Sequence, residues 1–258
     1  MKSASAPAAD LCRAYQLMHQ HNGHQHWWPG DTPFEICVGA ILTQNTSWTN
    51  VERAIANLKA AHVLEPKKLY ALPETQLAEF LRPAGYFNVK ARRLRSFLRV
   101  LVEECGGDLK QFFAGDTAAV RHRLLAIKGV GPETADSMLL YAGGHHSFVV
   151  DAYTKRIFTR HRWWSAPVQN SKFKVPGSRL PKQKPATHNS RAEYDSLKQL
   201  CETTLDEKPR GYRLDYWQDY HAQLVMVGKE FCRARDPRCE QCPLKPLLPG
   251  GRLPKVKP

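Results

Sequence analysis

A Gly-Val-Gly turn between two helical segments constrains the fold of this chain more than any other feature. The residues from about Asp116 to Ile127 have helical character, and Pro132 suits the first turn of a second helix because its missing N–H needs no partner there. Between them lies Lys128-Gly129-Val130-Gly131, whose glycines can adopt backbone angles closed to other residues. Their amides and the positive end of the second helix predict a site for a phosphate diester. A tight helix–helix turn without a ligand is the alternative.

The sequence beyond this turn places a carboxylate at a defined position. The apolar run Phe148 to Val150 precedes Asp151, and a basic helical stretch that includes Arg156 follows it. A carboxylate in this context is typical of a helix N-cap. In their order and spacing, however, the turn, the apolar run and Asp151 resemble the helix-hairpin-helix DNA glycosylases of the endonuclease III superfamily.

This resemblance implies roles for individual residues. The hairpin of that family holds the DNA backbone, and the aspartate after the apolar run is its catalytic carboxylate, which aligns with Asp151. Bifunctional members carry a Schiff-base lysine two residues after the second glycine, where this chain has Glu133. A carboxylate cannot form an imine, so we expect a monofunctional glycosylase. The DNA-binding residues expected from this region are Lys128, Gly129, Val130, Gly131 and Arg156.

A polar segment that follows a buried helix carries a second part of the resemblance. The dense apolar stretch Phe34 to Leu42 predicts the helix, and Leu-Thr-Gln-Asn-Thr follows, as in the family. There the glutamine enters the DNA where the damaged nucleotide leaves, which assigns that role to Gln44, with Asn45 beside it. Alternatively, both side chains cap backbone groups at a helix junction.

A basic segment also resembles the family, which has Gly-x-Tyr/Phe-x-x-Lys-Ala where this chain has Gly85 to Ala91. Lys90 is the lysine of this motif, and we expect it to bind DNA. Further along, Arg92, Arg95 and Arg99 share one face of the predicted helix, while leucines and a phenylalanine face inward. That basic face is either solvated or in contact with phosphates.

Three tryptophans bear on the choice of base. Trp27 and Trp28 precede the buried helix and Trp48 follows it. Such aromatic residues commonly pack in a core, but they can also stack on an extruded base, and a cationic alkylated purine stacks well on electron-rich rings. Trp-Trp-Pro ahead of the apolar helix resembles the 3-methyladenine glycosylase branch, which also lacks the Schiff-base lysine.

The resemblance therefore implies a base excision repair glycosylase that hydrolyses the N-glycosidic bond of damaged, alkylated purines such as 3-methyladenine. Two alternatives stay open. One is an endonuclease III-like glycosylase for oxidised or mismatched pyrimidines. The other is a catalytically weak DNA-binding relative.

The C-terminal region contains Cys232, Cys239 and Cys242 with the spacing C-x6-C-x2-C. This spacing resembles the iron–sulfur loop of the same superfamily, which continues with x5-Cys, but that last position is Leu248 here. Three thiolates can still hold a 4Fe-4S cluster, with water, a small ligand or another side chain on the fourth iron. A zinc site with three cysteines and one histidine, or no metal at all, is the alternative.

Composition narrows the class of partner. The 258 residues carry a formal net charge of +14, which favours a polyanion such as DNA. No apolar run approaches the roughly 18 residues of a membrane helix, and no signal-like segment begins the chain. We therefore expect a cytoplasmic, nucleoid-associated monomer that acts on double-stranded DNA with a damaged base and binds no membrane.

The expected fold is all-α, the two-lobed helix-hairpin-helix DNA glycosylase fold with a C-terminal iron–sulfur-type cysteine loop. One lobe would comprise residues 34–150, with the hairpin at 124–142. The other would comprise residues 1–33 and 151–258 with the cysteine loop. The stretch 165–190 has four prolines, five lysines or arginines and no acidic residue, so we interpret it as a basic insertion.

Overall fold

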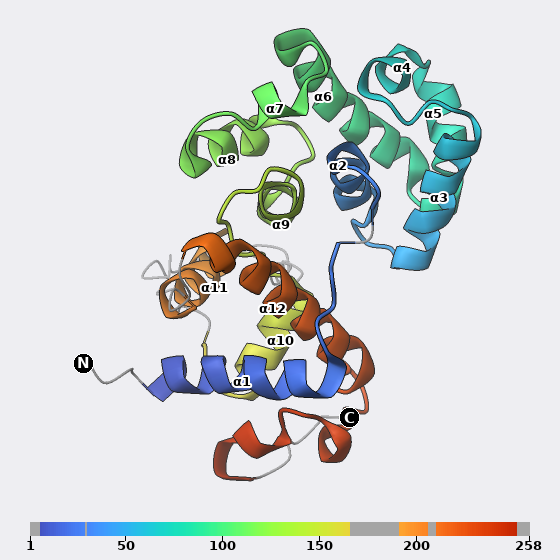
Figure 1. Cartoon of the computed structure of the whole chain (residues 1–258). Coiled ribbons are helices and arrows are strands. Elements are labelled where there is room, and N and C mark those ends of the chain that lie inside the picture. Colours follow the sequence, from blue (N-terminus) through green and yellow to red (C-terminus); the bar gives the residue numbers. More distant parts are fainter. Residues whose placement is uncertain (1–5, 29, 166–190, 206–209, 252–258) are drawn as a thin grey trace, which may run out of the picture. The chain divides into compact units, whose positions relative to one another are not determined.

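A computed structural model describes residues 6–28, 30–165, 191–205 and 210–251 (Figure 1). Every regular element within these ranges is helical, which confirms the all-α fold class. The basic insertion predicted at 165–190 lies, apart from Ser165, outside the described residues. None of the described helices combines the length and the apolar character that crossing a membrane requires.

The chain divides into two compact units. Unit 1 comprises residues 1–24, 150–207 and 223–258, and unit 2 comprises residues 25–149 and 208–222. The hairpin and the three tryptophans belong to unit 2, whereas Asp151 and the cysteine loop belong to unit 1.

Unit 2 is built around α2 (Pro33–Leu42), the helix predicted from the dense apolar stretch. Thr32 starts it, because its hydroxyl oxygen accepts a hydrogen bond from the N–H of Glu35 at 3.1 Å, and Pro33 occupies the first helical position. All residues from Phe34 to Leu42 are buried, so α2 is covered on every side rather than on one face. A helix that is apolar all round is expected to take such a central position.

Further helices of unit 2 follow α2 along the chain. In chain order they are α3 (Trp48–Ala60), α4 (Pro66–Ala71), α5 (Glu74–Phe80), η1 (Arg82–Ala84), α6 (Phe87–Cys105), α7 (Leu109–Phe112), α8 (Thr117–Ala126), α9 (Pro132–Ser137) and the π-helical stretch η2 (Met138–Ala142). Of these, α3, α6, α9 and η2 contact α2 directly (Figure 1). The apolar face predicted for α6 is its buried face: Leu94, Phe97, Leu98 and Leu101 are fully inaccessible to solvent.

Unit 1 consists of helices and a turn-rich C-terminal segment. Its elements are α1 (Ala6–Asn22), α10 (Ala152–Arg160), α11 (Arg191–Thr204), the end of α12 (Arg210–Glu230) and the short turns η3 (Cys239–Gln241), η4 (Lys245–Leu247) and η5 (Pro249–Gly251). Helical periodicity alone predicts a start at Tyr216 for the last long helix, but α12 begins six residues earlier, at Arg210.

Candidate functional site

The hairpin has the helix–turn–helix form that the glycines predict. Asp116 starts α8, because its carboxylate accepts a hydrogen bond from the N–H of Ala119 at 2.9 Å, and Ile127 ends it. Gly129 has φ = +94°, in the region that favours glycine, and a Cβ there would lie 2.3 Å from Cγ of Arg93. Conformation and space therefore both require glycine at this position.

The hairpin leaves backbone donors available. The N–H of Val130 is used within the turn, since it donates to the carbonyl of Ile127 at 3.0 Å, and the Val130 side chain is buried. The N–H groups of Gly129 and Gly131 donate to no group in the part of the chain that the structure describes. Two amides beside the start of a helix can bind an anionic oxygen.

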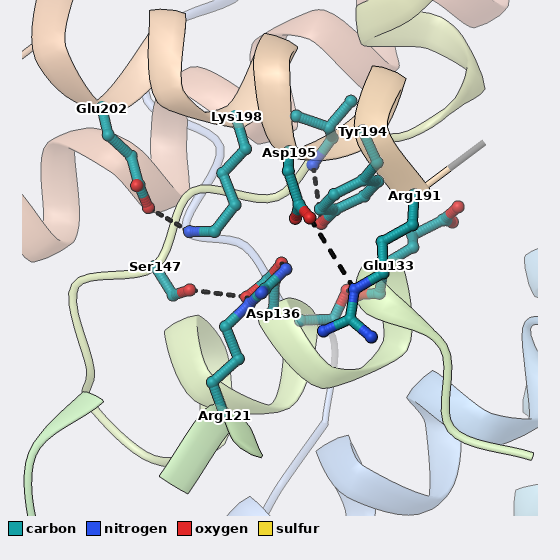
Figure 2. A network of polar contacts seen from close by, with 11 residues as sticks. Arg121, Glu133, Asp136, Ser147, Arg191, Tyr194, Asp195, Lys198 and Glu202 are labelled. Carbon is teal, nitrogen blue, oxygen red and sulfur yellow. Dashed lines mark hydrogen bonds and ion pairs between the residues drawn. The ribbon is translucent and has the colours of Figure 1, made fainter. Parts of the chain in front are cut away.

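A buried ion pair joins the two helices of the hairpin (Figure 2). Arg121 on α8 donates from Nε to Oδ1 of Asp136 on α9 at 2.8 Å, and from a terminal nitrogen to Oδ2 at 3.0 Å. Ser147 donates to the same Oδ1 at 2.6 Å, and the Asp136 side chain is 0% exposed. Sequence reasoning missed this pair. The one sign of it in the sequence is the acidic residue Asp136, which stands just before the apolar residues that begin at Met138.

Gln44 lies against the hairpin rather than projecting from the fold. Its Nε2 donates to the carbonyl oxygen of Gly129 at 3.1 Å and to the hydroxyl of Thr134 at 3.0 Å, while its Oε1 accepts a hydrogen bond from Arg93. Entry of Gln44 into DNA stays a prediction, and it would require these bonds to break. The neighbouring Asn45 is exposed, with φ = +55°.

The structure brings the three predicted tryptophans together. The ring of Trp28 lies edge-on to that of Trp48 at 5.5 Å between centroids, and 6.1 Å from that of Trp27. Gly39 on α2 makes room for them, because a Cβ there would lie 3.2 Å from the Trp48 ring and 3.6 Å from Nε1 of Trp28. The buried Nε1–H groups of Trp28 and Trp48 have no hydrogen-bond acceptor among the described residues.

Tyr141 belongs to the same aromatic cluster, although the sequence did not single it out. Its ring centroid lies 5.1 Å from that of Trp28. Its hydroxyl lies 2.6 Å from Nδ1 of His221 and 3.1 Å from the carbonyl oxygen of Gln218. Only the tertiary structure joins these residues, because some 80 positions separate them in the chain.

Asp151 is the N-cap of α10, as its sequence context predicts. Its Oδ1 accepts hydrogen bonds from the N–H of Thr154 at 2.7 Å and from the hydroxyl of Thr154 at 2.9 Å. These bonds fix the direction of the carboxylate, which is partly exposed. The catalytic role of Asp151 stays a prediction.

Glu133 lies in the first turn of α9 and is exposed. The position that holds lysine in bifunctional relatives is therefore accessible in this fold, but it carries a carboxylate. An exposed carboxylate in the first turn of a helix is favoured by the helix dipole.

Lys90, which the family motif predicts as a DNA contact, is buried. Its side chain is only 1% exposed, and its Nζ donates to the carbonyl oxygen of Ala84 at 2.7 Å. Burial, with a smaller contribution from the charge of Arg93, lowers the pKa of Lys90 to about 8. The amine faces the interior and holds the turn before α6, so DNA binding by Lys90 stays a prediction and would require this contact to break.

A basic cavity of about 850 Å³ lies beside the hairpin in unit 2. Arg92 and Arg99 are exposed and two turns apart on α6, which places them about 10 Å apart along the helix. Neither of them, nor Lys128 of the hairpin, forms an ion pair with a described residue. The full lining is Tyr70, Glu74, Val89, Arg92, Arg93, Arg95, Ser96, Arg99, Lys128 and Gly129. Five cations and one carboxylate give this cavity a positive potential.

In unit 1, the three cysteines of the predicted loop line one small cavity. Arg160 donates to Sγ of Cys232 at 3.2 Å and to the carbonyl of Arg233 at 2.7 Å. Burial raises the pKa of the Cys242 thiol to about 11 and also raises that of Cys239. No three of the described His, Cys, Asp or Glu side chains converge tightly enough to hold one metal ion.

Arg156, a predicted DNA contact, holds the same loop. Its Nε donates to the carbonyl oxygen of Cys232 at 2.6 Å, and a terminal nitrogen donates to that of Gly228 at 3.1 Å. The guanidinium also lies over the ring of Tyr153. These contacts make Arg156 a structural anchor of the cysteine loop within unit 1, and DNA binding by Arg156 stays a prediction.

Known proteins resemble this chain along most of its length. Residues 38–175 match the model of the HhH-GPD superfamily of base excision DNA repair proteins. A Methanocaldococcus jannaschii protein named "Putative DNA repair glycosylase" is 42% identical over 236 residues, which are 91% of this chain and 94% of that protein. Endonuclease III of Bacillus subtilis is 23% identical over 85% of this chain and 82% of its own length.

Solved structures share the fold. The 3-methyladenine DNA glycosylase of H. pylori, bound to 1,N6-ethenoadenine, has a TM-score of 0.66 and 26% identity, covering 87% of this chain and 97% of that one. An endonuclease III–DNA complex has a TM-score of 0.69 at 19% identity, covering 95% and 96% of the two chains.

We expect Asp136→Asn to lower the free energy of unfolding by about 3 kcal/mol or more, because it leaves the Arg121 charge without its buried partner. Urea unfolding followed by circular dichroism measures this decrease. Glu79→Gln is the matched control, since Arg82 binds Glu79 with the same two-bond geometry at 2.9 and 2.8 Å but on the surface. Equal decreases for both variants would contradict a special role for the buried pair.

The lowered pKa of the buried Lys90 predicts that the stability of the protein depends on pH. Its pKa is about 8 in the folded protein and about 10.4 in an unfolded chain, so between these values the unfolded chain binds more protons. The free energy of unfolding of the wild type should therefore rise over this range relative to that of Lys90→Met. The difference between the wild type and the exposed-lysine control Lys67→Met should stay constant over the same range. A constant difference between wild type and Lys90→Met would mean that the buried amine keeps its charge.

Proposed function

The chain belongs to the HhH-GPD superfamily of base excision DNA repair proteins and is a DNA repair glycosylase, and we propose that it is a monofunctional enzyme for alkylated purines such as 3-methyladenine. The observation that carries the choice of substrate is the cluster of Trp27, Trp28, Trp48 and Tyr141 in unit 2.

Aromatic rings suit a purine that carries a positive charge. Alkylation at a ring nitrogen makes adenine cationic and weakens its glycosidic bond, and a cation over an aromatic face is stabilised electrostatically. Trp28 is in contact with three other aromatic rings, so its orientation is fixed before any base arrives. The H. pylori 3-methyladenine glycosylase, bound to an adenine derivative, supports this choice as a neighbour of the same fold.

In the reaction we propose, Asp151 stabilises the positive charge that develops on the sugar as the base leaves, and it orients the attacking water. The two hydrogen bonds from Thr154 hold its carboxylate in one direction, so little reorganisation is needed. Bond cleavage gives the free base and an abasic site. Glu133 offers no amine that could attack the sugar, which supports hydrolysis without strand cleavage.

The hairpin and the basic cavity supply the affinity for DNA in this proposal. The Gly129 and Gly131 amides and Lys128 bind phosphate oxygens at the hairpin, and Asn45 is accessible to the same duplex. Arg92 and Arg99 bind further phosphates of the backbone, and their separation of about 10 Å along the helix corresponds to about three base steps of 3.4 Å. Double-stranded DNA with a damaged base is the proposed partner, and the enzyme acts on it as a monomer in the cytoplasm, at the nucleoid.

We also propose a 4Fe-4S cluster at the cysteine loop, on the basis of the cysteine spacing and the endonuclease III relatives. Each thiolate of such a cluster binds its own iron, so the sulfur atoms must surround a cavity rather than converge on one point. Cys232, Cys239 and Cys242 line one cavity, which supports this proposal. When bound, the cluster would hold the loop together. It takes no part in base release.

The decisive experiment is base release from duplex DNA treated with a methylating agent, resolved by chromatography, beside duplexes that contain thymine glycol or uracil. We expect free 3-methyladenine without strand nicking, and no release from the other two duplexes. Asp151→Asn should abolish release while DNA binding persists, because asparagine can still cap α10. Release from the oxidised or uracil duplex instead would contradict the role of the aromatic cluster.

Borohydride trapping tests the monofunctional chemistry separately. The wild type should give no covalent protein–DNA product, and Glu133→Lys is the positive control, since it places an amine at the family's lysine position. A trapped adduct with the wild type would reveal a different amine nucleophile.

For the basic cavity, we expect Arg92→Ser/Arg99→Ser to weaken binding to undamaged duplex and to flatten its salt dependence. The slope of log K against log salt should decrease by about 0.9 for each phosphate that the variant no longer neutralises. Arg13→Ser/Arg53→Ser removes the same charge from exposed positions outside the cavity and should leave the slope near that of the wild type. Equal slopes for both double variants would mean that only net charge matters.

A further inference from the structure

We infer that Arg93 completes the phosphate site of the hairpin, and that a phosphate oxygen displaces the amide oxygen of Gln44 from the Arg93 guanidinium. This inference rests on the proposed binding of DNA phosphates at Lys128 and Gly129, and not on the proposed substrate. It adds a binding residue to the hairpin, and it ties the position of Gln44 to the occupancy of that site.

The first observation is that Arg93 on α6 lies directly against the hairpin. A Cβ built on Gly129 would lie 2.3 Å from Cγ of Arg93 and 3.0 Å from its Cβ and Cδ, so the stem of the arginine contacts the backbone of the turn. Arg93 also lines the basic cavity together with Lys128 and Gly129. It therefore belongs to the same surface as the amide and the lysine to which we assign a phosphate.

The second observation concerns the charge of Arg93. The side chain is partly buried and forms no ion pair with a described residue. Its charge contributes to the lowered pKa of the buried Lys90, so it acts on a second cation. A partly desolvated guanidinium without a carboxylate partner is a favourable site for an anion, because the attraction between opposite charges is stronger where less water screens it.

The third observation is the kind of group that Arg93 binds. Arg95, two residues further along α6, donates to the carbonyl oxygens of Tyr70 and Leu72 at 3.3 and 2.5 Å, so the backbone of the fold holds it. Arg93 instead donates to Oε1 of Gln44, which is its one hydrogen-bond partner among the described residues. A phosphate carries a full charge and can accept from two guanidinium nitrogens at once, so it is the stronger partner.

Gln44 can give up this contact and still remain on the hairpin. Its Nε2 is held separately, by the carbonyl oxygen of Gly129 at 3.1 Å and by the hydroxyl of Thr134 at 3.0 Å. A phosphate that takes Arg93 therefore removes one of the three hydrogen bonds of this side chain and leaves two. Gln44 is then held less firmly wherever the DNA backbone occupies the turn.

The test is a titration of the full-length ¹⁵N-labelled protein with inorganic phosphate, followed by nuclear magnetic resonance at the Gly129 amide. Gln44→Met is the decisive variant, because methionine has a similar length and no oxygen to displace. We expect it to bind phosphate about tenfold more tightly than the wild type, since a hydrogen bond to a charged group no longer has to break. If Gln44 only supported the hairpin, its removal would weaken binding instead.

Two further variants show whether the effect passes through the guanidinium. Arg93→Met should weaken phosphate binding at Gly129 by about tenfold, and adding Gln44→Met to it should cause no further change. Arg53→Met and Gln111→Met alter exposed side chains outside the cavity and are the matched controls, so their affinities should stay near that of the wild type.

A second readout needs no substitution at Gln44. The order parameter of its side-chain amide, from ¹⁵N relaxation, reports how firmly the group is held on the ps–ns timescale. We expect saturating phosphate to lower this order parameter in the wild type and to leave it unchanged in Arg93→Met.

The outcomes are distinct. Tighter binding by Gln44→Met that disappears in the Arg93→Met background supports the inference, as does a Gln44 amide that becomes more mobile with phosphate. Weaker binding by Gln44→Met with an unchanged order parameter would overturn the displacement, and equal binding by the wild type and Arg93→Met would overturn the role of Arg93. A Gly129 amide that does not respond to phosphate in the wild type would overturn the phosphate site and this inference together. None of these results depends on the release of a base, so a failure of the proposed substrate would leave them unchanged.

Discussion

The buried ion pair between Arg121 and Asp136 is the interaction on which the hairpin depends. The amides of the hairpin must be presented at one angle to bind a phosphate, so the two helices beside them need a fixed arrangement. A two-bond contact between α8 and α9, with Ser147 as a third partner, fixes that angle. Because the carboxylate is fully inaccessible to solvent, removal of either charge leaves the other uncompensated.

Several side chains have a structural task and a proposed chemical one at once. Asp151 caps α10, and the same hydrogen bonds direct the carboxylate to which we assign charge stabilisation. Gln44 bridges Gly129 and Thr134, so the segment after α2 and the hairpin are positioned together. For Asp151 the fold supplies preorganisation, since the bonds that stabilise the native state also restrict the functional group. The bonds of Gln44 would instead have to break before its side chain could enter DNA.

Basic residues in this chain divide into two groups that sequence cannot separate. Arg156 and Arg160 form hydrogen bonds to carbonyl groups of the cysteine loop, and Lys90 to that of Ala84. Arg92 and Arg99, by contrast, are exposed and line a cavity. The net charge of +14 therefore overstates the charge available to a polyanion, because part of it stabilises the fold.

The sequence by itself determined the local structure and the family. The apolar run of α2, the glycines of the hairpin and the capping residue Asp151 predict their elements because each effect acts within a few residues of the chain, and the family match confirmed the resemblance. The sequence also shows a carboxylate, Glu133, two residues after the second glycine of the hairpin, where the resemblance predicts the family's lysine. The tertiary structure alone decided that Lys90 is buried and that distant residues meet.

Contacts between residues far apart in the chain depend on how helices pack, which no local pattern encodes. Tyr141 therefore reaches His221, and His161 reaches Leu247, only in the folded chain. Asp136 shows the same limit: its carboxylate is acceptable in a fully buried position only because the fold brings Arg121 and Ser147 to it.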